Sequence, residues 1–217
     1  MNKKIICGVS AYSSYVKLSV SDGIKHIDFS KQILNFEDIF FDKLSNMVKK
    51  FNCKFSDISE IDIIRGPGRF TGIRSLYTFA KVYNVLSGAR VYGIDVFEAL
   101  VYNLYQSGYE GDVAVVVHAF KDEFYLCYYR IKNKKIIRKQ SPEWIFIDKL
   151  KKKLDNFKGV LISDFEDYPE TYSIFNNLDK APSEISKIIP YNIIKASKFF
   201  SHTDISPFYL KPAKFEL

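Results

Sequence analysis

Long apolar runs are absent from this chain of 217 residues. One of the longest, residues 113–117, is far shorter than the roughly 20 residues that a membrane-spanning helix needs. Residues 1–6 lead into a strand-like segment and do not resemble a signal peptide. We therefore expect a protein that works in the cytoplasm, without membrane contact.

Cysteine and histidine are scarce, with three of each. The three cysteines, Cys7, Cys53 and Cys127, form no Cys-x-x-Cys pair and no disulfide framework. The three histidines occur in no His-x-x-x-His or His-Glu-x-x-His pattern, and no Gly-x-Ser-x-Gly motif is present. The sequence therefore predicts no metal site and no catalytic residue.

Acidic residues are fewer than basic ones, with 25 Asp and Glu against 32 Lys and Arg, which gives a net charge of +7. Such a balance favours RNA or an acidic protein surface through non-specific electrostatics. Much of the excess lies in lysine runs, at residues 132–135 and 149–153, and such runs are often solvated faces. A tRNA-binding module therefore stays open as an alternative.

The pattern that is present is an ordered series of strands and helices, and it occurs twice. In the first half, Asp22-Gly23 is a hairpin turn signal, and Asn35 is placed to cap a helix. The expected strands are residues 4–9, 15–20, 25–29, 61–64 and 90–94, and the helices 35–51, 71–87 and 95–105. In the second half, the strands are 113–118, 123–131, 135–138 and 159–163, and the helices 145–157 and 193–201. We predict a duplicated α/β architecture with lobes at 1–106 and 107–217.

A glycine-rich turn joins the strand at 61–64 to the next helix. It contains Gly66, Gly68, Arg69, Thr71 and Gly72, and Thr71 stands where a helix cap is needed. Glycines let an anion approach the backbone N–H groups at a helix N-terminus, and Arg69 or Arg74 would add positive charge. The alternative is that these glycines are needed only for backbone conformations with positive φ angles and for close packing of the helix. No Gly-Lys-Ser/Thr follows, so the turn is not a Walker loop.

The helices before and after this turn are more apolar than one core requires. The apolar positions are Phe40, Leu44, Met47 and Phe51 on the first helix, and Ile73, Leu76, Ala80 and Tyr83 on the second. A neighbouring line on the second helix adds Phe79, Val82 and Leu86, so about half its circumference is apolar, whereas a core stripe needs roughly 100°. Either this pair of helices binds another protein, or the second helix is deeply buried.

Residues 66–74, GPGRFTGIR, resemble the GPGSFTGLR signature of the TsaB (YeaZ) family, with Arg69 in place of serine and Ile73 in place of leucine. The segments at 56–62 and 93–96 resemble that family's sequence around the signature. Weaker resemblances are the His118-Ala119-Phe120 stretch and the Pro207-Phe208-Tyr209-Leu210 segment.

The resemblance implies the actin-like, sugar-kinase and Hsp70-like (ASKHA) fold, with two βββαβαβα lobes that duplicate a ribonuclease H-like motif. It implies a non-catalytic scaffold in the synthesis of threonylcarbamoyladenosine on tRNA, with tRNA engaged through the complex. The partners implied are a TsaD-type transferase, a TsaE-type ATPase and a second copy of the chain. The first two helices would bind the TsaD-type protein, and no intrinsic cofactor is expected, with ATP at a complex interface.

The chain departs from the family pattern where the fold binds phosphate. Gly8-Val9-Ser10 ends the first strand without the usual aspartate, so a magnesium–phosphate complex lacks a ligand. His118 and Phe120 replace an aspartate and an arginine. These departures favour a scaffold over the alternative of a small-molecule kinase or ATPase with the same fold.

Overall fold

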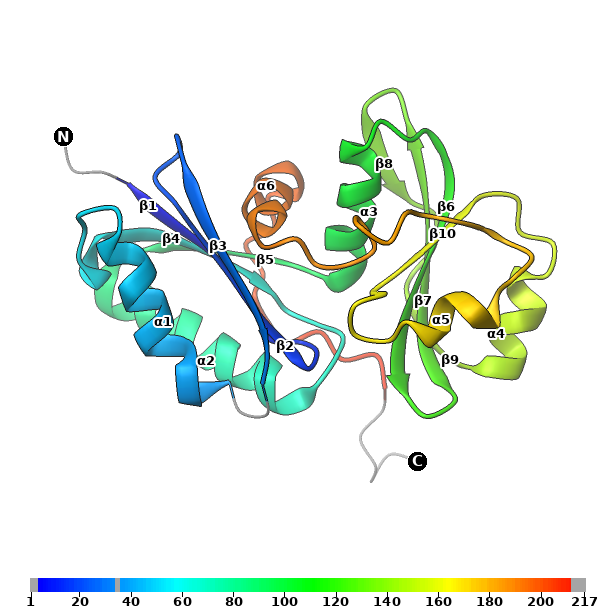
Figure 1. The fold of residues 1–217 in the computed structure, drawn as a ribbon, viewed down its shortest axis with the longest axis horizontal. Coiled ribbons are helices and arrows are strands. Elements are labelled where there is room, and N and C mark those ends of the chain that lie inside the picture. The colour runs from blue at the N-terminus through cyan, green and yellow to red at the C-terminus, as the bar shows by residue number, and fades with distance from the viewer. Residues whose placement is uncertain (1–3, 34–35, 212–217) are drawn as a thin grey trace. The chain divides into compact units, whose positions relative to one another are not determined.

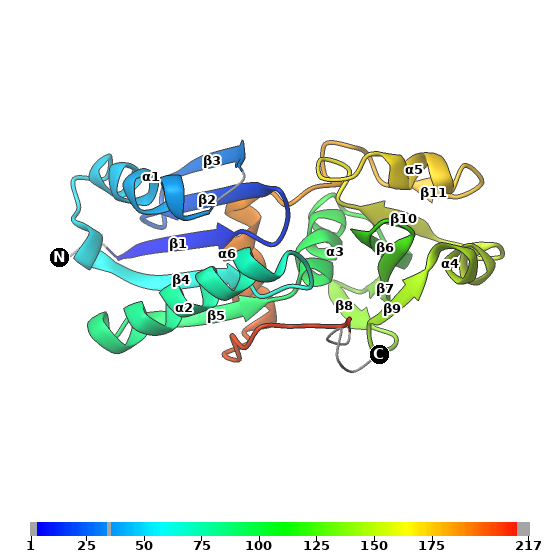
Figure 2. The same ribbon diagram turned by 90° about the horizontal axis from the view of Figure 1, so that it is seen from below.

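The computed structural model describes residues 4–33 and 36–211, so the helix cap expected at Asn35 lies outside the described residues. The chain divides into two compact units, which Figures 1 and 2 show by residue colour. The first comprises Met1–Val96 and Ile189–Phe208, and the second comprises Phe97–Ile188 and Tyr209–Leu217. No helix in the described part of the chain is long and apolar enough to cross a membrane.

The sheet of the first unit has the strand order β3-β2-β1-β4-β5 among the described residues. Its strands are β1 (Ile5–Ser10), β2 (Tyr15–Ser21), β3 (His26–Gln32), β4 (Ile58–Ile64) and β5 (Arg90–Ile94). The first three run antiparallel, with Gly23 in the predicted hairpin turn at a φ of 88°. Strand β4 pairs in parallel with β1, and β5 pairs in parallel with β4.

The sheet of the second unit repeats this order as β8-β7-β6-β10-β11 within the described residues. Its strands are β6 (Gly111–Phe120), β7 (Glu123–Lys132), β8 (Lys135–Arg138), β10 (Val160–Ser163) and β11 (Asp179–Lys180). The same order and the same change from antiparallel to parallel pairing recur, so the predicted duplicated fold is confirmed.

One extra strand, β9 (Glu143–Phe146), pairs with β7 where the sequence predicts the start of a helix. Trp144 and Phe146 point to one face and the buried Ile145 to the other, which is the alternation of a strand. The predicted helix therefore begins later. The strand β11, and a short helix before it, were not predicted.

The helices are α1 (Glu37–Lys49), α2 (Phe70–Ser87), α3 (Val96–Gln106), α4 (Ile147–Leu154), α5 (Glu170–Ile174) and α6 (Pro190–Phe200), with a 3-10 turn at Phe55–Asp57. The expected boundary at residues 106 and 107 differs from the compact units. Most of α3 belongs to the second unit, while α6 packs on β1–β5 of the first (Figure 2).

Gly8 makes room for α6. A Cβ atom there would lie 3.0 Å from Cγ1 of Ile194 and 3.2 Å from the backbone oxygen of Pro190. The departure from the family pattern at Gly8 therefore coincides with close helix packing.

Candidate functional site

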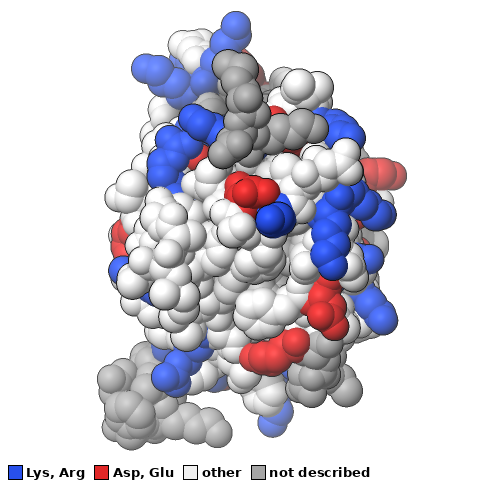
Figure 3. Space-filling model, turned by 90° about the vertical axis from the view of Figure 1, so that its left-hand side faces the viewer, with Lys and Arg blue, Asp and Glu red and all other residues white. Residues whose placement is uncertain are grey.

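Helices α1 and α2 lie together at the end of the first unit that Figure 3 turns toward the viewer, and a broad area of that end carries no charged side chain. The apolar side chains exposed on these helices include Phe41 of α1, at 52%, and Val82, Val85 and Leu86 of α2, at 51%, 79% and 80%. Val82 and Leu86 lie on the second apolar line that the sequence showed on α2. These two residues face solvent, whereas Phe79 on the same line is buried.

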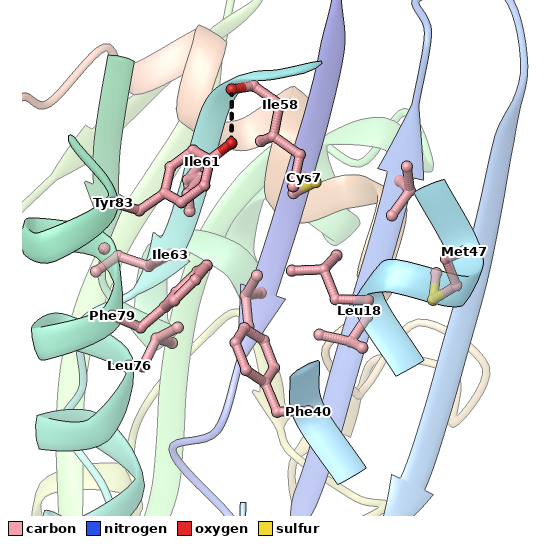
Figure 4. Close-up of a cluster of buried hydrophobic side chains, with 14 of the residues drawn as sticks. Cys7, Leu18, Phe40, Met47, Ile58, Ile61, Ile63, Leu76, Phe79 and Tyr83 are labelled. Atoms are coloured by element: carbon pink, nitrogen blue, oxygen red, sulfur yellow. Dashed lines mark hydrogen bonds between the residues drawn. The ribbon is translucent and has the colours of Figure 1, made fainter. Parts of the chain in front are cut away.

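The eight residues predicted to bind a partner are all buried, and of their side chains that of Tyr83 also lines the groove between α1 and α2. Phe40, Leu44, Met47, Phe51, Ile73, Leu76, Ala80 and Tyr83 are each at most 9% exposed. Figure 4 shows several of these side chains pointing between the helices and the sheet, toward Cys7 and Leu18. We therefore correct this assignment, because covering the sheet already uses these stripes.

A groove of about 570 Å³ runs between the two helices above this core. The rings of Phe79 and Tyr83 line it, with centroids 5.9 Å apart, and Phe41 lies 5.7 Å from Phe79. The Tyr83 hydroxyl donates to the backbone oxygen of Phe55, 2.7 Å away, which holds the ring in place. The other lining residues are Phe36, Glu37, Phe55, Arg74, Ser75, Thr78, Val82 and Leu86.

The rim of the groove is polar. The Ser75 hydroxyl donates a hydrogen bond to the Glu37 carboxylate, which joins α2 to α1 and lowers the pKa of Glu37. The guanidinium of Arg74 lies 4.9 Å from the ring of Phe70. An apolar centre with a polar rim is the usual arrangement of a protein–protein interface.

The glycine-rich turn is packed against its own chain. A Cβ atom on Gly68 would lie 2.2 Å from the backbone oxygen of Tyr12, and one on Gly72 would lie 2.0 Å from that of Ala11. The Arg69 N–H donates to the Tyr12 oxygen at 2.6 Å. The backbone around Gly68 and Gly72, which an anion would approach, is therefore covered.

The remaining residues of the predicted anion loop fit the same explanation. Gly66 has a φ of 120°, and its Cβ position is 2.6 Å from the backbone oxygen of Phe208. The helix begins at Phe70 after the capping residue Arg69, so Thr71 lies in its first turn and does not cap it. Arg69 and Thr71 remain exposed. Packing accounts for all three glycines.

A carboxylate that the sequence did not reveal lies directly beside Gly8. Asp62 pairs with Gly8 across β1 and β4 and is fully buried, and neither of its carboxylate oxygens has a hydrogen-bond partner among the described residues. Burial raises the pKa of Asp62 well above its usual range, and the charge of Glu60 raises it further. Asp62 therefore does not supply the accessible carboxylate that the first strand lacks.

We expect the Asp62→Asn variant to be more stable than the parent protein at pH 8 and similar to it at pH 4. Unfolded, the Asp62 carboxyl ionises near pH 4, whereas the folded protein keeps it protonated to higher pH. The native state thus binds more protons above pH 4, so this carboxyl lowers the free energy of unfolding as pH rises. Urea unfolding between pH 4 and 8 measures this effect. If the free energy of unfolding changed with pH by the same amount in the two proteins, this explanation would be contradicted.

The two departures from the family pattern in the second unit form no recognisable catalytic group. The His118 ring stacks on Tyr168 with centroids 3.7 Å apart, and its Nε2 lies 2.9 Å from the backbone oxygen of Lys121. Phe120 is 58% exposed. Over the described residues, no three His, Cys, Asp or Glu side chains are placed to hold a metal ion together.

Comparisons with known proteins agree with this fold. The family model described as "TsaD: tRNA N6-adenosine threonylcarbamoyltransferase" matches residues 35–200. The tRNA threonylcarbamoyladenosine biosynthesis protein TsaB of Buchnera aphidicola subsp. Acyrthosiphon pisum (strain APS) is 23% identical over 158 residues, which cover 70% of this chain and 71% of the relative.

Two solved structures share the fold across nearly the whole chain. YeaZ from Pseudomonas aeruginosa has a TM-score of 0.75 and 13% identity, with 95% of this chain and 100% of that one covered. A protein described as similar to peptidase YeaZ from Pseudomonas aeruginosa has a TM-score of 0.74 and 12% identity, with 96% and 100% covered. Because the family model matches most of the sequence, the chain belongs to the TsaD family, and within it the signature at residues 66–74 and the curated relative are similar to the TsaB (YeaZ) group.

Proposed function

We propose that this chain is a non-catalytic scaffold that binds a TsaD-type transferase through the groove between α1 and α2. Its family membership supports a role in the synthesis of threonylcarbamoyladenosine on tRNA. The observation that carries the scaffold role is the row of exposed apolar side chains beside this groove, which includes Val82, Val85 and Leu86. A TsaE-type ATPase would join the complex, with ATP at an interface between subunits.

The groove has the composition that helix docking needs. Burying a valine or leucine side chain contributes about 1.5–3 kcal/mol, and Val82, Val85 and Leu86 leave much of that contribution unused in the free chain. Helix-in-groove recognition places apolar side chains at helical spacing against such a surface. A second copy of this chain could bind the same surface and form a homodimer. The homodimer and the complex with the TsaD-type protein would then exclude each other.

Co-purification with the TsaD-type protein of the same organism tests the proposal. We expect the two proteins to elute as one complex at micromolar concentration on size-exclusion chromatography. If they remain separate, even with ATP and the TsaE-type ATPase present, the scaffold role is wrong.

The kinase alternative is less well supported, because the chain's own backbone covers Gly68 and Gly72 and α6 packs over Gly8. Sustained ATP hydrolysis by the isolated chain would reverse this preference. The tRNA-binding alternative requires affinity for tRNA that falls steeply as salt increases. If isolated chain and tRNA do not bind at low salt, that alternative is removed.

A further inference from the structure

A cluster of aromatic rings and one carboxylate lies on the second unit, outside the surface proposed above. Glu123 pairs with Phe146 across β7 and β9, and Trp144 pairs with Tyr125 two residues further along. Side chains two apart on a strand share a face, so Glu123, Trp144 and Phe146 lie on one face of this strand pair. The indole N–H of Trp144 donates to Oε2 of Glu123 at 3.1 Å, which fixes the carboxylate against the ring.

The chain's own Lys211 fills this cluster. Its Nζ lies 2.5 Å from the same Oε2 of Glu123. The ammonium is also 5.5 Å from the Trp144 ring centroid and 5.9 Å from that of Phe120. Both distances lie within the roughly 6 Å range of cation–π attraction, which is strongest for tryptophan. One positive charge thus contacts a carboxylate and two aromatic rings at once.

We propose that Glu123, Trp144 and Phe120 form a binding site for a single alkylammonium group, and that Lys211 is its resident ligand. The Glu123 side chain is only 14% exposed, so its charge is poorly screened and favours a cationic partner. Lys211 follows Tyr209 and Leu210, so occupation of the site holds this described segment on the second unit. Phe120 and Phe146 remain 58% and 52% exposed, which leaves room for a competing lysine from another protein.

The Lys211→Met variant tests this inference, with Nα-acetyl-lysine amide as the probe. Methionine keeps much of the length of lysine and removes its charge, so the site becomes vacant. Trp144 is the only tryptophan, and its fluorescence therefore reports on this site alone. We expect the probe to change the emission of the variant saturably in the millimolar range. The parent protein should respond at least tenfold more weakly, because Lys211 occupies its site.

Two further variants and one neutral probe make the test specific. Lys121→Met is the matched control, because the Lys121 ammonium lies 5.4 Å from the Phe120 ring, and it should respond like the parent. Adding Glu123→Gln to Lys211→Met should abolish the response, and Nα-acetyl-norleucine amide, which lacks the charge, should give none. The inference is overturned by an absent response in Lys211→Met, an equal response in the parent, or a response that survives Glu123→Gln.

Discussion

Replacing Leu86 by aspartate is expected to weaken association with the TsaD-type protein by about 30-fold or more. Leu86 is 80% exposed and lines the groove, so a partner that covers it would have to desolvate the new charge. A loss of about 2 kcal/mol, typical of an interface hot spot, corresponds to roughly that factor. The free energy of unfolding should change by no more than about 0.5 kcal/mol, as at most exposed positions. Isothermal titration calorimetry and urea unfolding measure the two quantities.

The matched control is Leu76→Asp on the same helix. Leu76 is fully buried under the sheet-facing side of α2, so aspartate there should destabilise the fold by more than about 4 kcal/mol. The sequence alone placed Leu76 and Tyr83 on the pair of helices expected to bind a partner, whereas both side chains are buried. Unchanged affinity in Leu86→Asp, or a stably folded Leu76→Asp, would contradict the account of the two faces.

Gly72→Ala is expected to lower the free energy of unfolding by about 2 kcal/mol, although it introduces the best helix former into a helix. Helix propensity alone predicts stabilisation by roughly 1 kcal/mol. The added Cβ would lie 2.0 Å from the backbone oxygen of Ala11, and a backbone atom cannot give way as a flexible side chain does. Overpacking of this kind typically costs about 1–3 kcal/mol. Packing therefore reverses the sign of the effect.

Thr78→Ala on the exposed side of α2 is the control, since it changes helix propensity without a close contact. Urea unfolding should show it slightly more stable than the parent protein. If Gly72→Ala is also as stable as the parent, the glycines of this turn are not explained by packing, and an anion site regains support.

The strand pattern was the part of the fold that the sequence predicted best. The Asp22-Gly23 turn and the alternating strands around it were found where expected, because both depend on local chemistry. The helix predicted at residues 145–157 began too early, at Ile145 and Phe146, because a short apolar stretch fits the start of a helix as well as a strand. These residues form a strand because they pair with β7, and this pairing is a long-range contact that local sequence patterns do not show.

The sequence did not separate the two faces of α2, because the eight residues predicted to bind a partner are all buried, whereas Val82, Val85 and Leu86 are exposed. Leu76 and Leu86 are both leucines on apolar lines of α2, and periodicity gives their angular separation without saying which line faces the sheet. Asp62 escaped notice for a similar reason. Its burial depends on α6, which begins at Pro190, more than 100 residues later in the chain.

Photo-crosslinking from the groove tests the central claim most directly. Benzoylphenylalanine in place of Val85, which is 79% exposed beside the groove, should crosslink to the TsaD-type protein. The same group in place of Ile24, which is 96% exposed in the turn between β2 and β3, should not. A crosslink from position 85 alone is the predicted result. Equal crosslinking from both positions, or crosslinking only from position 24, would contradict the proposal that this groove binds the partner.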